Sequence, residues 1–225
     1  MTNAGRSMES VSGPHRGQPL LTSGAPAQAA DAALVLCHGR GATAQGVVNL
    51  FDPVYRHGVA FVAPQADRSR WFPRPATAPR TENEPWLTSA VECVEAALET
   101  ARSAGVPPET TVLAGFSQGA CVVAEFVRRS PARYGGLALL SGHLPGQPDA
   151  TDDRSRQGSL DGTPVLVGCG RDDDRIDLDR VADTAELFER AGGDVDERYY
   201  PDTGHEVTDD EFDAIRSLLA DALSA

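Results

Sequence analysis

Five residues in the middle of the chain could supply a nucleophile: Gly115-Phe116-Ser117-Gln118-Gly119, which has the form G-x-S-x-G. A serine hydroxyl attacks an acyl carbonyl carbon once a neighbouring base has taken its proton. The motif works when the serine lies on a sharp turn between a strand and a helix, where glycines allow the two elements to approach closely. A glycine-rich turn with an incidental serine would look the same, so the flanking residues must decide.

The flanking residues favour the nucleophile. Residues 111–114 form a short apolar run that suits a buried strand, and residues 120–129 carry apolar side chains at helical spacing. The N–H groups at the start of such a helix, together with its dipole, point at developing negative charge near Ser117.

The base must come from one of five histidines, at positions 15, 38, 57, 143 and 205. In this arrangement the serine, the acid and the histidine follow one another along the chain, which leaves His143 and His205. His205 lies in a polar Gly-His loop before the last predicted helix and is the predicted base. His143 follows the apolar run 137–140 and is predicted to line the substrate pocket.

The acid is expected between the serine and the histidine, at the end of a strand. The apolar run 164–169 leads into three consecutive aspartates, Asp172, Asp173 and Asp174. A buried carboxylate there would orient the imidazole and stabilise its charged form. The chemistry alone does not choose among the three, and an acidic surface loop is the plain alternative. A calcium loop is disfavoured because the alternating D-x-D-x-D-G pattern is missing.

An oxyanion hole needs two N–H donors. The apolar run 32–37 ends in His38-Gly39-Arg40-Gly41. Enzymes with a G-x-S-x-G serine place one donor in a turn of this kind, and the second donor is the residue after the nucleophile. The predicted donors are therefore the backbone amides of Arg40 and Gln118. His38 is interpreted as a structural residue of the turn.

These motifs resemble the phospholipase/carboxylesterase branch of the α/β hydrolases, the group that contains acyl-protein thioesterases and bacterial carboxylesterases. The matching segments lie in the family's order at residues 38–42, 63–64, 115–119, 140–145, 170–173 and 204–205. The family's acid follows Gly-x-x and precedes a proline and two apolar residues, a register that implies Asp173. Here Asp174 and Arg175 replace the proline and the first apolar residue, so Asp172 stays a competitor. Residues 71–73 and 83–85 resemble a subgroup of small prokaryotic esterases.

Strand and helix patterns alternate along the chain, which predicts an α/β fold with a mostly parallel, doubly wound sheet flanked by helices. The expected strands are 32–37, 59–63, 111–115, 136–141, 164–169 and 195–200, and the expected helices are 85–104, 119–130, 178–191 and 209–223. Residues 1 to about 16 are rich in Ser, Gly and Asn and are expected to be disordered, leaving residues 17–225 as a single α/β-hydrolase domain.

The chain of 225 residues carries a net charge of −13, and all 20 of its basic residues are arginine. This charge disfavours nucleic acid as a partner, and it fits either a high-GC genome or a salt-adapted cytoplasm. Four cysteines without metal-ligand spacing indicate buried thiols in a reducing compartment, no metal and no cofactor. A signal-peptide core and a long apolar span are both missing, which predicts a cytoplasmic protein without stable membrane insertion. The oligomeric state stays open, a homodimer included.

The segment 65–85 is long, rich in proline and carries Trp71 and Phe72. These aromatic side chains are predicted to bind substrate together with His143, although they could instead cover the core. Without a lid insertion, a shallow site for small soluble esters is expected. The predicted function is a serine carboxylesterase that works through an acyl-enzyme. The alternatives are a lysophospholipase, an acyl thioesterase or a dienelactone-type hydrolase, and, outside the enzymes, a hydrolase-fold binding protein or sensor.

Overall fold

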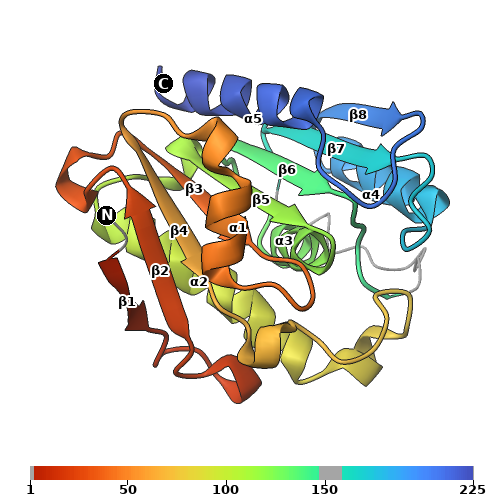
Figure 1. Cartoon of the computed structure of the whole chain (residues 1–225), viewed down its shortest axis with the longest axis horizontal. Coiled ribbons are helices and arrows are strands. Elements are labelled where there is room, and N and C mark those ends of the chain that lie inside the picture. The colour runs from red at the N-terminus through yellow and green to blue at the C-terminus, as the bar shows by residue number, and fades with distance from the viewer. Residues whose placement is uncertain (1–2, 147–158, 225) are drawn as a thin grey trace.

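A computed structural model describes residues 3–146 and 159–224 of the chain. Within them, eight strands form one twisted sheet in the order β1-β2-β4-β3-β5-β6-β7-β8 (Figure 1). The strands from β4 to β8 in that order run parallel, and β1 and β2 add an antiparallel edge. The strands are β1 Asn3–Ser7, β2 Pro19–Gly24, β3 Ala32–Cys37, β4 Val59–Pro64, β5 Thr111–Phe116, β6 Gly136–Leu140, β7 Pro164–Gly170 and β8 Asp194–Tyr200.

Helices cover both faces of the sheet, and the strands supply apolar side chains to each face in turn. In β3, Leu34 and Leu36 pack with α1 and α5, whereas Val35 and Cys37 pack with the helices of the other face. This two-sided burial explains why the central strands are continuous apolar runs. The α/β-hydrolase-type fold predicted from the sequence is confirmed. The helices are α1 Ala44–Leu50, α2 Trp86–Ser103, α3 Gln118–Arg129, α4 Leu178–Arg190 and α5 Asp209–Ala222.

The parallel register brings the loops that carry the predicted site to one edge of the sheet. Cys37 at the end of β3 pairs with Gly115 in β5, and Phe116 at the end of β5 pairs with Leu140 in β6. The carboxyl ends of neighbouring strands therefore open at the same place, which is where ligands bind in open α/β sheets.

The N-terminal segment differs from the expected disorder. Residues 3–16 include β1 and a short 3-10 turn, Gly13–His15, and the side chains of Met8, Val11 and His15 are buried. The Ser12 hydroxyl donates to Glu92 of α2 at 2.9 Å. Composition misleads here because a few apolar residues suffice once a folded surface is present for them to pack against.

Two further elements, β2 and α1, carry weak sequence signals. β2, which lies between β1 and β4 in the sheet, consists of Pro, Leu, Thr, Ser and Gly, and α1 has seven residues with Gly46 inside. No helix in the described part of the chain combines the length and apolar character needed to cross a membrane.

Candidate active site

Ser117 lies on a turn whose geometry is unusual for a residue with a side chain. Its φ of 57° and ψ of −123° place it in a strained region of backbone space. The two motif glycines make the turn possible. A Cβ on Gly119 would lie 2.0 Å from the Cys37 carbonyl oxygen, and a Cβ on Gly115 would lie 2.4 Å from the carbonyl carbon of Gly119. The close approach of β3, β5 and α3 thus presents the serine at the sheet edge.

His205 lies between Ser117 and Asp173 and contacts both. Its Nε2 is 2.9 Å from the Ser117 Oγ, and its Nδ1 is 2.7 Å from the Asp173 Oδ2. The ring also packs on Phe116, with the ring centroids 4.8 Å apart. The structure therefore brings together the predicted nucleophile, base and acid from three loops that are far apart in the sequence.

Of the three consecutive aspartates, only Asp173 reaches the histidine. Its side chain is fully buried, and its Oδ1 accepts a hydrogen bond from the Arg175 N–H at 2.9 Å. Asp172 and Asp174 are exposed to solvent. A buried carboxylate held by a backbone donor can fix the imidazole ring, which a solvated carboxylate cannot do.

Arg40 and Gln118 lie on the two sides of Ser117 and line the same cavity. Gln118 is the first residue of α3, so its N–H is one of those that a helix leaves without an intrahelical partner. Both side chains turn to the segment 71–74. The Gln118 Nε2 donates to the Phe72 carbonyl oxygen at 2.9 Å, and the Gln118 Oε1 accepts from the Trp71 N–H at 2.9 Å.

The cavity in front of Ser117 has a volume of about 470 Å³ and an apolar wall. The wall includes Val47 and Leu50 from α1, Phe116, Cys121 and Ile176. The α1 residues were not expected in the wall because the sequence did not predict this helix. A cavity of this size can hold a small organic ligand.

Comparison with known proteins identifies the family. Residues 23–223 match the family model described as phospholipase/carboxylesterase. The chain belongs to this family. Among solved structures, a phospholipase/carboxylesterase from Dyadobacter fermentans has 32% identical residues and a TM-score of 0.84, with 90% of this chain and 96% of the other covered.

Two curated relatives match over shorter segments. A probable carboxylesterase SOBER1-like of Arabidopsis thaliana is 28% identical over 64% of this chain and 55% of its own length. An acyl-protein thioesterase 1 of Kluyveromyces lactis is 27% identical over 61% of this chain and 60% of its own length. The chain thus spans little more than half the length of these relatives. The names of these two relatives describe a carboxylesterase and an acyl-protein thioesterase.

In this family member, Trp71 is a core residue and not part of the cavity wall. Its side chain is fully buried, and its Nε1 donates to the His38 carbonyl oxygen at 2.7 Å. The predicted contact with substrate therefore falls to Phe72, which does line the cavity. Both aromatic residues lie in one loop, and the sequence could not show which of the two rings lines the cavity.

His38 has the structural role expected for it. Its Nδ1 donates to the Gly39 carbonyl oxygen at 2.8 Å, and its Nε2 accepts from the Ala66 N–H at 3.1 Å. Burial lowers the pKa of this imidazole, only partly offset by the bond to Gly39. A neutral ring with one donor and one acceptor therefore joins the loop after β3 to Ala66.

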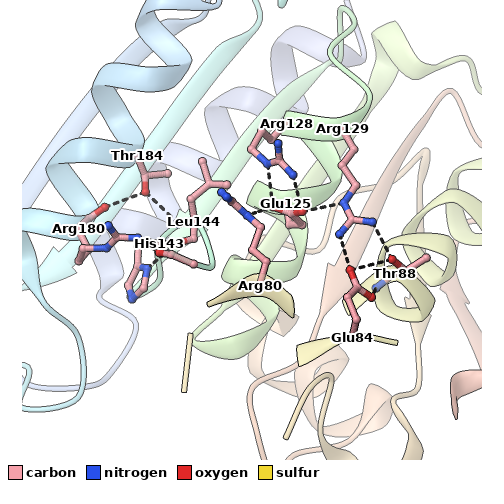
Figure 2. Close-up of polar contacts among 11 residues, drawn as sticks. Arg80, Glu84, Thr88, Glu125, Arg128, Arg129, His143, Leu144, Arg180 and Thr184 are labelled. Carbon is pink, nitrogen blue, oxygen red and sulfur yellow. Dashed lines mark hydrogen bonds and ion pairs between the residues drawn. The ribbon is translucent and has the colours of Figure 1, made fainter. Parts of the chain in front are cut away.

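His143 is buried in the wall of the cavity, where it was expected. Its Nδ1 donates to the Leu144 carbonyl oxygen at 2.8 Å, and the Leu144 N–H donates to the Thr184 hydroxyl at 2.9 Å (Figure 2). Burial lowers the pKa of His143, so the ring is neutral and its Nε2 can act only as an acceptor. This imidazole can accept a hydrogen bond from a substrate.

Figure 2 also shows a buried ion cluster centred on Glu125 of α3. The Glu125 carboxylate is fully buried and accepts hydrogen bonds from Arg128 and Arg129, each at 2.7 Å to its Oε1. Arg80, from the loop that forms the cavity wall, lies 3.4 Å away. Burial alone would raise the pKa of Glu125, but the two helix arginines outweigh it and hold the pKa below its usual range. The cluster was not predicted, because charges at (i, i+3) and (i, i+4) normally indicate a solvated helix face.

Within residues 3–146 and 159–224, no group of three or more His, Cys, Asp or Glu side chains is arranged to hold a metal ion. The four cysteines are buried and free. Burial raises the pKa of Cys121 to about 11, so this thiol in the cavity wall stays protonated at neutral pH.

Proposed function

We propose that the chain is a serine carboxylesterase that hydrolyses small soluble esters through an acyl-enzyme. The observation that carries this proposal is the pair of hydrogen bonds made by His205, to the Ser117 Oγ at 2.9 Å and to the Asp173 Oδ2 at 2.7 Å. This is the contact order that acyl transfer by a serine requires.

In the proposed first half-reaction, the Ser117 Oγ attacks the ester carbonyl carbon while His205 Nε2 takes the hydroxyl proton. The carbonyl oxygen becomes an oxyanion that accepts hydrogen bonds from the backbone N–H groups of Arg40 and Gln118. Each such donor contributes about 3 kcal/mol of transition-state stabilisation in related sites. The imidazolium then gives its proton to the leaving alcohol, which leaves the acyl group on Ser117.

In the second half-reaction, His205 takes a proton from water, and the resulting hydroxide attacks the acyl carbon. Collapse of the second oxyanion releases the acid and returns the proton to Ser117. Asp173 stays ionised throughout and stabilises the imidazolium in both steps. The buried, free cysteines are compatible with a reducing cytoplasm.

The direct test combines 4-nitrophenyl esters of increasing acyl length with the Ser117→Ala variant. We expect kcat/KM to peak between acetyl and hexanoyl, because each methylene is worth about 0.8 kcal/mol only while it is buried. Ser117→Ala should fold normally and lose all but a trace of activity. A fluorophosphonate should label wild type at Ser117 and leave the variant unmodified.

Two results would change the assignment. Absence of both hydrolysis and labelling in the folded wild type would favour a binding protein or sensor. A steady rise of kcat/KM through dodecanoyl and palmitoyl esters would favour a lysophospholipase or an acyl-protein thioesterase, the activity in the name of one relative. Thioester and ester forms of one acyl group, assayed side by side, separate those two.

A further inference from the structure

The charges around the cavity contrast with those of the rest of the protein. The chain has 33 acidic and 20 basic residues. Among the described residues that line the cavity there is neither Asp nor Glu, but there are two arginines, Arg40 and Arg175. A protein with this net charge repels anions at long range, so a cationic lining must have a local cause.

The two arginines are bound differently. The Arg40 guanidinium donates to three backbone carbonyl oxygens of the segment 72–74. The Arg175 side chain is 71% exposed, and its nearest acidic atom is the Asp174 Oδ1 at 4.0 Å, on a side chain that is itself 92% exposed. An exposed pair at that distance contributes little. Within the described residues, the Arg175 guanidinium therefore has its hydrogen-bond donors available.

The backbone of Arg175 is fixed next to the reacting groups. Its N–H donates to the Oδ1 of Asp173, whose other oxygen contacts His205. Arg175 is also the position where the resembled family pattern has an apolar residue. An arginine in the wall of a cavity that is otherwise largely apolar supplies a planar donor pair that matches a carboxylate.

We infer that the cavity selects esters that carry a carboxylate group, with Arg175 as the specificity-determining residue. This inference rests on the proposed esterase function. The carboxylate could belong to the acyl part, as in a half-ester of a dicarboxylic acid, or to the alcohol part, as in an acyloxy acid. The recognition chemistry is the same in both cases.

Matched ester pairs test the inference. For the acyl part, we compare mono(4-nitrophenyl) adipate with 4-nitrophenyl methyl adipate. For the alcohol part, we compare 3-acetoxybenzoate with methyl 3-acetoxybenzoate. At low ionic strength, wild type should hydrolyse the carboxylate form of at least one pair with a kcat/KM about five- to tenfold higher than that of its neutral form, an effect expressed in KM and weakened by salt. The pair that shows the preference identifies the part that carries the charge.

Variants of one loop isolate the residue. Arg175→Gln, which keeps the backbone N–H that donates to Asp173, should bring the ratio close to one, mainly by raising KM for the carboxylate ester. Arg175→Lys should keep part of the preference. Arg171→Gln is the matched control: it removes the same charge from the same loop, but Arg171 lies over the Tyr199 ring, 5.4 Å from its centroid, and is not in the cavity wall. It should leave the ratio unchanged.

A binding measurement separates this inference from the esterase proposal. In the Ser117→Ala background, calorimetry should show that the carboxylate ester of at least one of the two pairs binds more tightly than the neutral ester of that pair, and the difference should disappear with Arg175→Gln. Equal binding of the carboxylate and neutral esters in both pairs, or a ratio in the kinetic assay that Arg175→Gln does not change, overturns the inference while hydrolysis of neutral esters stands. A binding difference in a wild-type protein that hydrolyses none of the four esters overturns the esterase proposal alone.

Discussion

Arg40 and Gln118 donate side-chain hydrogen bonds to the same acceptor, the carbonyl oxygen of Phe72, each at 2.9 Å. The two residues whose backbone amides are proposed to bind the oxyanion thus also hold the loop that forms the cavity wall. A displacement of this wall is therefore expected to displace the backbone N–H groups of Arg40 and Gln118 as well.

We therefore expect Arg40→Met to lower kcat by about tenfold although the backbone N–H is kept, because a small displacement of an oxyanion donor weakens transition-state binding. Steady-state kinetics on a short-chain ester measures the effect. Arg74→Met, which removes an equal charge at an exposed position of the segment that Arg40 contacts, serves as the control. Equal kinetics for the two variants would mean that the shared acceptor has no role in catalysis.

The three aspartates can be separated by kinetics. Asp173→Asn should reduce kcat by about 10⁴-fold, because an amide favours the wrong imidazole tautomer. Asp172→Asn and Asp174→Asn, at exposed positions, should stay within a few-fold of wild type. If Asp172→Asn were the damaging change, the acid would lie one residue earlier than the geometry indicates.

The two histidines near the cavity should differ in the parameter they affect. His205→Ala should be almost inactive, since it removes the only imidazole that contacts Ser117 among the described residues. His143→Ala should mainly raise KM, because His143 bonds to the Leu144 carbonyl and lies in the cavity wall. Circular dichroism checks that both variants fold. Equal losses of kcat would show that the base has been misassigned.

The cluster around Glu125 predicts a pH-dependent stability. Because the pKa of Glu125 is lower in the folded than in the unfolded chain, its contribution is present above about pH 4.5, the unfolded value, and is lost as pH falls through the folded value. Glu125→Gln should lower the free energy of unfolding by about 3 kcal/mol at neutral pH, since it removes the buried negative charge that accepts hydrogen bonds from Arg128 and Arg129.

Denaturant unfolding at a series of pH values measures this contribution. The difference between wild type and Glu125→Gln should shrink as the pH is lowered into the acid range. Glu99→Gln, on the exposed surface of α2, should stay within about 0.5 kcal/mol of wild type throughout. A difference that stays constant with pH would mean that the charge of Glu125 does not contribute.

The sequence predicted those parts of the molecule that depend on local pattern. Central strands such as β3 and β7 are apolar runs because helices cover both faces, and the glycines around Ser117 report a close approach that only glycine allows. Chain order pointed to His205 as the base, and the resemblance pointed to Asp173 as the acid, with Asp172 as a competitor. In the structure, the Asp173 side chain is buried and contacts His205, whereas Asp172 is exposed. Burial is a property of the folded chain, so the run of three aspartates alone could not show which of them is buried.

The remaining features depend on contacts between distant segments. Nothing local distinguishes Trp71 from Phe72: both side chains are buried in the core, but only Phe72 also lines the cavity. The spacing of Glu125 from Arg128 and Arg129 is typical of a solvated helix face, yet its carboxylate is buried and lies 3.4 Å from Arg80 of a distant loop. The N-terminal segment was misjudged for the same reason, because Met8 and Val11 are too sparse to signal a core until the helix they pack against is in place.

That N-terminal segment also reaches the loop beside the site. His15 accepts from the Asp67 N–H at 3.1 Å and donates from Nε2 to the Trp71 carbonyl oxygen at 2.9 Å, while its own N–H donates to the Ser89 hydroxyl at 3.0 Å. A protein that begins at residue 17 would lose these three hydrogen bonds and keep all the residues proposed to react. Deletions or fused tags at residues 1–16 are therefore expected to change the position of the loop beside the site, and with it turnover, as a substitution in the pocket would.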